Sequence, residues 1–190
     1  MSERPQMPDR QCGECSLCCT VLRVDEIAKL GGTPCQHVRS GAGCGIHAHR
    51  PGICRAYECM WLRGKFRDED RPDRLGAVVD LVPVGASVRL SIRQAAPNLF
   101  DGSPRLQQIA AEFREHMPIR ITDVSAVLNP DHPFRVLLAN GEEQRVAGDS
   151  VTTLRGGVEV ETTRMSWPER VARSVALRWR GFQLRRTGSR

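Results

Sequence analysis

The sequence predicts an α+β protein in which a small cysteine-rich, metal-stabilised N-terminal module packs on a β-rich domain with a C-terminal helix. Three observations lead to this fold class. All eight cysteines lie between Cys12 and Cys59. The middle of the chain is rich in β-branched residues and is punctuated by glycine turns, and its end repeats apolar residues at helical spacing. We therefore divide the chain into a disordered lead (1–11), the cysteine-rich metal-chelating module (12–74), a β-rich α+β region (75–163) and a basic amphipathic helix (164–190).

The composition is ordinary for a globular protein, with 190 residues of which 40% are hydrophobic and 26% charged. No stretch approaches the roughly 18 uninterrupted apolar residues of a transmembrane segment. The polar N-terminus lacks the apolar core of a secretory signal. We therefore expect a cytoplasmic protein, whose thiols stay reduced.

The cysteine-rich segment is expected to fold with little apolar burial. Glycine and proline are scattered through it as in loops, and residues 25–30 predict one short helix stopped by Gly31 and Gly32. A bound metal is the usual substitute for a missing core in so small a unit. Residues 64–74 are expected to form a charged linker or surface loop.

The β-rich region begins with a predicted hairpin of residues 76–84 and 87–94, joined near Gly85, and Pro83 indicates an edge strand. A helix over 104–116 follows, with Ser103 as its N-cap. Further strands are predicted at 119–128, 134–139 and 144–147, with a type I′ turn at Asn140–Gly141, and a last hairpin at 151–163 about Gly156–Gly157.

The last predicted helix covers 167–186, with Ser166 as its cap and an apolar stripe of Val171, Val175, Trp179 and Phe182. From residue 164 onward there are eight arginines and one acid, Glu169, a balance of +7, so the net charge of +6 for the whole chain comes from this segment. The helix is expected to dock on the body, to contact nucleic acid or anionic lipid, or to bind an acidic protein. The candidate contacts with an anionic partner are Arg170, Arg173, Arg178, Arg180, Arg185 and Arg186.

The cysteine spacing predicts a metal site. Two residues separate successive thiols in the run from Cys12 to Cys18, which lets a tight turn aim two sulfurs at one ion. Cys19 is adjacent to Cys18, and neighbouring side chains tend to point to different sides, so the pair is expected to serve two metals unless one thiol does not bind. Eight thiolates would fill two tetrahedral zinc sites, and would also suffice for a bridged polynuclear cluster or an iron–sulfur cluster. The candidate ligands are Cys12, Cys15, Cys18, Cys19, Cys35, Cys44, Cys54 and Cys59.

Other chemistry has weak support in the sequence. No phosphate-binding glycine loop, G-x-S-x-G elbow or H-E-x-x-H motif is present. Asp80 and Asp123 are predicted to be exposed strand residues. His116 and His132 are predicted to be structural or solvated.

The stretch CGECSLCC, followed by CGIHAHRPGICRAYEC, resembles the YkgJ-type CxxCxxCC family of zinc- or iron-chelating domain proteins. The resemblance covers the first third of the chain. It is carried by Cys12, Cys15, Cys18 and Cys19 and by Cys44, Ile46, Arg50, Pro51, Cys54 and Arg55. His47 stands where the family has an aromatic residue, commonly Tyr, and the resemblance therefore implies packing around the ligands and not metal binding.

Two further groups are expected to support the cysteines. Arg50 and Arg55 can neutralise the excess negative charge of thiolates and donate hydrogen bonds to sulfur. An apolar lid over the cluster is predicted from Tyr57, Trp61, Leu62 and Phe66.

The function expected from these residues is chelation of zinc or iron, including an iron–sulfur cluster, by a mainly structural cysteine cluster. One alternative, which the resemblance allows, is an iron–sulfur-dependent methyltransferase-like enzyme related to the flagellin lysine methylases and using S-adenosylmethionine. A second alternative is a nucleic-acid-binding protein that uses the arginine-rich C-terminal helix.

Overall fold

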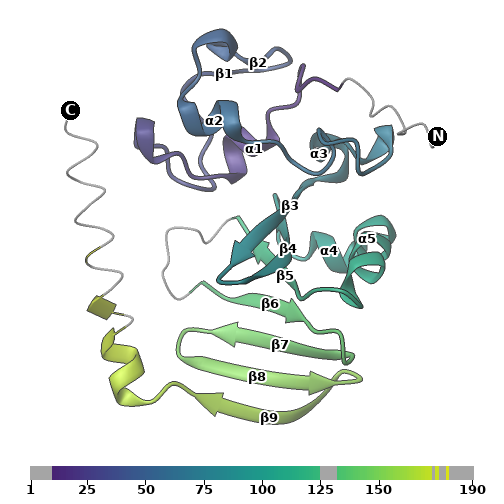
Figure 1. The fold of residues 1–190 in the computed structure, drawn as a ribbon, viewed down its shortest axis with the longest axis vertical. Coiled ribbons are helices and arrows are strands. Elements are labelled where there is room, and N and C mark those ends of the chain that lie inside the picture. Colours follow the sequence, from purple (N-terminus) through teal and green to yellow (C-terminus); the bar gives the residue numbers. More distant parts are fainter. Residues whose placement is uncertain (1–9, 125–131, 173, 176–178, 180–190) are drawn as a thin grey trace.

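The computed structural model describes residues 10–124, 132–172, 174–175 and 179. It is a mixed α+β structure in which an irregular cysteine-rich part lies beside a seven-stranded sheet (Figure 1). Two short helices, α4 (Leu99–Gly102) and α5 (Pro104–Arg114), lie next to the first strands of this sheet.

The cysteine-rich part is built from very short elements joined by turns. The only stretch of the predicted helix at 25–30 that forms is a 3₁₀ turn, because Ala28 takes a left-handed conformation and Lys29 pairs back to Val24. The elements are α1 (Leu17–Val21), η1 (Asp25–Ile27), β1 (Val38–Arg39), β2 (Gly43–Cys44), η2 (His47–His49), α2 (Gly52–Ala56), η3 (Asp68–Asp70) and α3 (Pro72–Leu75).

The large sheet follows the order of the chain. Its strands are β3 (Ala77–Val84), β4 (Ser87–Gln94), β5 (Ile119–Asp123), β6 (Phe134–Leu137), β7 (Glu142–Ala147), β8 (Ser150–Arg155) and β9 (Val158–Arg164). All neighbours are antiparallel except β4 and β5, which are parallel and are connected through α4 and α5. The predicted edge position of Pro83 is confirmed, because β3 is an outermost strand.

Helix α5 forms where the sequence predicts it. The Oγ atom of Ser103 accepts a hydrogen bond from the backbone N–H of Leu106 at 3.3 Å, and Pro104 occupies the first turn. Leu106 and Ile109 are completely buried. Their burial attaches the helix to one face of β4 and β5 and forms the centre of the core.

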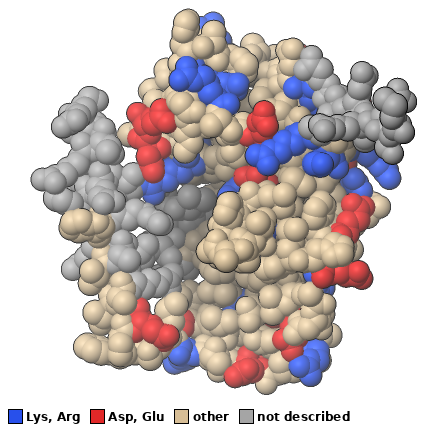
Figure 2. All heavy atoms as spheres, in the orientation of Figure 1, with Lys and Arg blue, Asp and Glu red and all other residues tan. Residues whose placement is uncertain are grey.

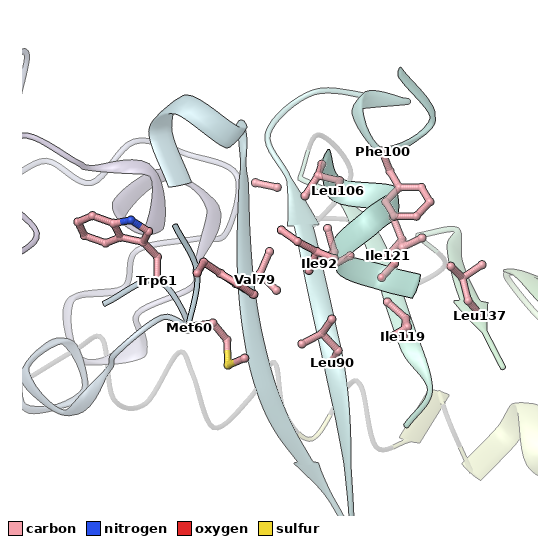
Figure 3. Packing of buried hydrophobic residues seen from close by; sticks show 14 residues of the cluster. Met60, Trp61, Val79, Leu90, Ile92, Phe100, Leu106, Ile119, Ile121 and Leu137 are labelled. Atoms are coloured by element: carbon pink, nitrogen blue, oxygen red, sulfur yellow. The ribbon is translucent and has the colours of Figure 1, made fainter. Parts of the chain in front are cut away.

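Strand alternation divides the sheet into an apolar and a polar face. Leu90 and Ile92 of β4 and Ile119 and Ile121 of β5 point toward α5 and are buried (Figure 3). The residues between them point the other way, because successive side chains of a strand alternate. This second face carries Asp80, Arg89, Ser91, Arg93 and Arg120.

Several local predictions are wrong. Asp80 is 9% exposed and not a solvated strand residue. The turn at Asn140–Gly141 is not type I′, because only Gly141 has a positive φ, of +85°, whereas that turn requires a positive φ at both positions. The hairpin at Gly156–Gly157 is confirmed, with positive φ at both glycines.

The stretch 64–74 is part of the folded body and not a simple linker. The carboxylate of Asp70 is 3% exposed and accepts two hydrogen bonds from Arg105 on α5, at 2.7 and 2.6 Å. It also accepts the backbone N–H of Arg67 at 3.0 Å. A buried acid bound in this way fixes the stretch before β3 against α5.

The beginning of the C-terminal helix is present, with helical backbone at residues 167–172. Glu169 accepts hydrogen bonds from the backbone N–H and the hydroxyl of Ser166, both at 2.8 Å. Val171 and Val175 are exposed, so this part of the predicted stripe is not packed on the body. Trp179 of the stripe is exposed as well, whereas Phe182 and the other residues of ranges 173, 176–178 and 180–190 lie outside the described residues. None of the helices in the described ranges has the length and apolar content that a bilayer crossing requires.

Candidate functional site

All eight cysteines line one cavity of about 760 Å³. One wall is the cysteine-rich part, and the other is the polar face of β3 to β6. The eight thiols are free. On the surface shown in Figure 2, several basic side chains lie in the upper half, where Figure 1 places the cysteine-rich part.

The first cysteine run is shaped by a turn and a helical turn. The backbone N–H of Cys15 bonds the carbonyl of Cys12 at 2.9 Å, and α1 then carries Cys18 and Cys19. The Sγ atoms of these two neighbours are 4.0 Å apart. The adjacent thiols are therefore close enough to bind one ion or two ions held side by side.

Cys12, Cys15, Cys18 and Cys59 are neighbours. Burial raises the pKa of Cys15, and the nearby thiol of Cys59 raises it further. Burial also raises the pKa of Cys59, and the nearby thiol of Cys12 adds to that increase. The pKa of Cys18 is raised first by its hydrogen bond with Cys19, then by burial and by the nearby Cys12 and Cys15. Cys18 and Cys59 also pack against the same small hydrophobic cluster, which contains Val21.

Backbone N–H groups already point at two sulfurs of this set. They come from Leu17 and Asp73 to Cys15 and from Leu62 and Trp61 to Cys59, and they oppose the burial that raises the pKa of each thiol. Such hydrogen bonds favour the thiolate, which is the form that binds metals.

The other four cysteines, Cys19, Cys35, Cys44 and Cys54, form a second set. The backbone N–H of Cys35 bonds the carbonyl of Cys19 at 3.0 Å. The turn after Cys35 leads into β1, where Val38 pairs with Cys44. Burial raises the pKa of Cys54, and the thiols of Cys19, Cys35 and Cys44 raise it further.

Lys29 is a cation beside the second set that the sequence reasoning missed. It is 7% exposed, and its Nζ donates to the carbonyl of Thr20 at 2.7 Å and to that of Leu22. Burial lowers the pKa of Lys29, while nearby thiols, with Cys19 first, oppose the decrease. The pKa of Cys19 falls to about 7 through the hydrogen bond with Cys18, against its own burial, and with help from Lys29 and Arg50. The sequence offered one signal for this role, because Lys29 is a lysine in a chain whose basic residues are otherwise almost all arginine.

Glu26 fixes the helix that carries Cys54. Its carboxylate accepts the backbone N–H groups of Gly52 at 3.0 Å and Ile53 at 2.9 Å, which are the first free donors of α2. Negative charge at this end of a helix is favourable. The contact joins the loop after α1 to the segment from Arg50 to Cys54.

The predicted supporting residues are only partly brought to the cavity. His47 and Arg50 line it, and the buried Nε of Arg50 has no hydrogen-bond partner in the described part of the chain. Arg55 is exposed and is not among the lining residues.

The predicted apolar lid is divided between the cavity and the core. Tyr57, Trp61 and Leu62 line the cavity. Phe66 is instead buried in the main core, edge-on to Phe113 with 6.4 Å between ring centres.

The donor set fits a soft metal ion by its chemistry, since thiolates suit zinc, copper(I) and iron–sulfur clusters. Among the described residues, however, no group of three or more cysteine, histidine or acidic side chains is already placed to hold an ion. Binding would therefore require the thiols of a set to rotate toward one another within the cavity.

Most of the arginines predicted to contact an anionic partner lie outside the residues that the structure describes. Arg170 pairs with Asp149 at 3.3 Å. The others, Arg173, Arg178, Arg180, Arg185 and Arg186, lie outside the described residues.

Comparison of the chain with protein families, with curated proteins and with solved structures gives no match.

Proposed function

We propose that this protein binds zinc or iron through its eight cysteines and that the metal stabilises the N-terminal module. The observation that carries the proposal is the shared cavity of about 760 Å³, whose lining includes every cysteine of the chain as a free thiol. Membership of the YkgJ-type family is part of the same proposal.

The shortage of apolar burial supports a structural role for the metal. In residues 10–59, all of which the structure describes, Val21 and Val24 are the only buried hydrophobic residues. A segment with so little core is usually stabilised by disulfides or a metal. Since the thiols are free, a metal remains the stabilising element that this composition offers.

The arrangement of neighbours favours two tetrathiolate centres. One would use Cys12, Cys15, Cys18 and Cys59, and the other the remaining four cysteines. Each set has the four sulfurs of a closed structural site, and none is left over. The pair Cys18–Cys19 would then join the two centres.

Elemental analysis of the full-length protein, purified without oxygen, tests the proposal. We expect about two zinc ions per chain in a colourless protein, or iron with the brown colour of an iron–sulfur cluster. A chelator should unfold the N-terminal module. Protein with neither metal and with paired disulfides would overturn the proposal.

Single substitutions test the division into two sets. Cys15→Ser and Cys44→Ser should each lower the metal content by about half if the sets bind separately. His47→Tyr is the matched control on the same cavity and should keep the full content. Complete loss of metal in both cysteine variants would instead indicate one bridged cluster.

A further inference from the structure

The wall of the cavity opposite the cysteines is cationic. Arg89 and Arg93 lie two residues before and after Ser91 on β4, and Arg120 pairs directly with Ser91 across the parallel β4–β5 ladder. Side chains two residues apart share a face of a strand. The three arginines therefore flank one serine on the same face of the sheet, and all four residues line the cavity.

These guanidinium groups have donors without acceptors. The Nε of Arg89, the Nη1 of Arg93 and the Nε of Arg120 are buried and have no hydrogen-bond partner in the described ranges. Asp80 is the nearby acid, but its carboxylate is 3.7 Å from Arg93, which is longer than a hydrogen bond. Buried polar groups in folded proteins are normally paired, so the donors require an acceptor.

The three charges also oppose one another. Burial lowers the pKa of Arg120 to about 10, and the charges of Arg89 and Arg93 contribute to the decrease. Burial and the charge of Arg93 lower the pKa of Arg89 in the same way. An anion between the arginines would remove this repulsion.

The orientation of Arg120 suits an anion in the cavity. Its guanidinium carbon lies 3.8 Å from the ring centre of Phe134, so the group is held over the aromatic face. The donors of a guanidinium lie in its plane and match the two oxygens of a carboxylate or phosphate. The aromatic ring thus fixes the group without consuming its hydrogen bonds.

We propose that Arg89, Arg93 and Arg120 bind the carboxylate or phosphate group of a small molecule that enters the cavity. A volume of about 760 Å³ is in the range of small-molecule sites and exceeds what one such group needs. Tyr57 and His132 also line the cavity, and the Oη of Tyr57 and the Nδ1 of His132 are buried and lack partners among the described residues. They supply polar contacts for the rest of the ligand.

Isothermal titration of the full-length, anaerobically purified protein tests this site with two probes, inorganic phosphate and succinate, at constant ionic strength. We expect saturable binding of at least one probe, which also identifies the preferred group. Arg120→Gln should weaken it by about tenfold or more, because a charged hydrogen bond and the stacked cation are lost. Arg120→Lys keeps the charge but lacks the planar fork, and should bind with intermediate affinity.

Arg155→Gln is the matched control, because Arg155 is an exposed arginine of the same sheet that pairs with Glu142. It should bind the probes as the wild type does. Metal content is measured in every variant, since the arginines could otherwise act only as countercharge for metal-bound thiolates. Absence of saturable binding, equal affinity in Arg120→Gln and wild type, or loss of metal with unchanged probe binding would each overturn the proposal. Failure of the metal-binding proposal would leave this test unaffected, because the probes contact the other wall.

Discussion

Gly43→Ala is expected to separate the two cysteine sets. Gly43 precedes Cys44, has a φ of +72°, and lies so close to the loop of Cys12 that a Cβ atom would be 2.2 Å from the carbonyl oxygen of Gly13. The left-handed conformation costs alanine about 1–2 kcal/mol. The overlap adds about 1–3 kcal/mol, because the two loops must move apart by more than a tenth of a nanometre to reach an ordinary contact.

Gly41→Ala is the matched control for this substitution. Gly41 lies in the same turn with a φ of +68°, but no atom is within 4 Å of its added Cβ. Gly41→Ala should therefore lose only the free energy that the left-handed conformation costs alanine. The difference of about 1–3 kcal/mol corresponds to roughly 2–12 °C in melting temperature for a chain of this size.

The assay is thermal unfolding followed by circular dichroism, with metal content measured on the same samples. Gly43→Ala should melt well below Gly41→Ala and should retain less metal. Equal melting temperatures in the two variants would refute the close packing of the Cys12 and Cys44 loops on which the reasoning depends.

Two other substitutions test contacts that hold the module. Asp70→Asn should cost about 2–4 kcal/mol, because it leaves the Arg105 cation partly buried without its carboxylate. The hydrogen bonds from Arg105 lower the pKa of Asp70, so the stabilisation by this carboxylate is complete above about pH 4 and is lost as the pH falls through the folded-state pKa. Urea titrations should show that the free energy of unfolding depends less on acid pH in the variant than in the wild type. Identical pH dependence in the two proteins would contradict this assignment. Glu26→Gln should cost about 1 kcal/mol and speed amide exchange at Ile53, whereas Glu58→Gln, at an exposed pair with Arg63, should change neither.

Local elements could be predicted from the sequence because their signals are local. Ser103 and the apolar spacing of the following residues specify α5 without reference to the rest of the chain. Turn glycines and β-branched runs likewise specify the hairpins at Gly85 and at Gly156–Gly157. The turn at Gly141 was mistaken because Asn-Gly is compatible with more than one turn type.

Burial of polar residues could not be predicted, because it depends on tertiary pairing. Asp80 is the one charged residue in a run of apolar strand residues, and the cysteine-rich part lies against the face that carries it. Asp70 sits in a run of charges that resembles a solvated loop, and its partner Arg105 is 35 residues away in sequence.

The candidate site was accessible in part. The spacing from Cys12 to Cys19 identifies these thiols as a unit, but it does not show which of them lie beside Cys59 and which beside Cys54. The division of the eight cysteines into two sets follows from chain reversals at Cys35 and in α2. The grouping of Arg89, Arg93 and Arg120 could not be predicted from the sequence. It depends on the parallel register of β4 and β5, which brings Arg120 beside Ser91, and no sequence pattern specifies such a register.

The sheet extends well beyond the helix that covers it. In β7, β8 and β9, Leu154 is the one buried hydrophobic residue, and every residue of β9 is exposed. Such a region opens at a small fraction of the free energy needed to unfold the whole molecule. Proteolysis and amide hydrogen exchange should therefore be fastest in these three strands, while the strands that contain Leu90 and Ile119 remain protected. The outer strands would unfold locally while the core around α5 stays folded.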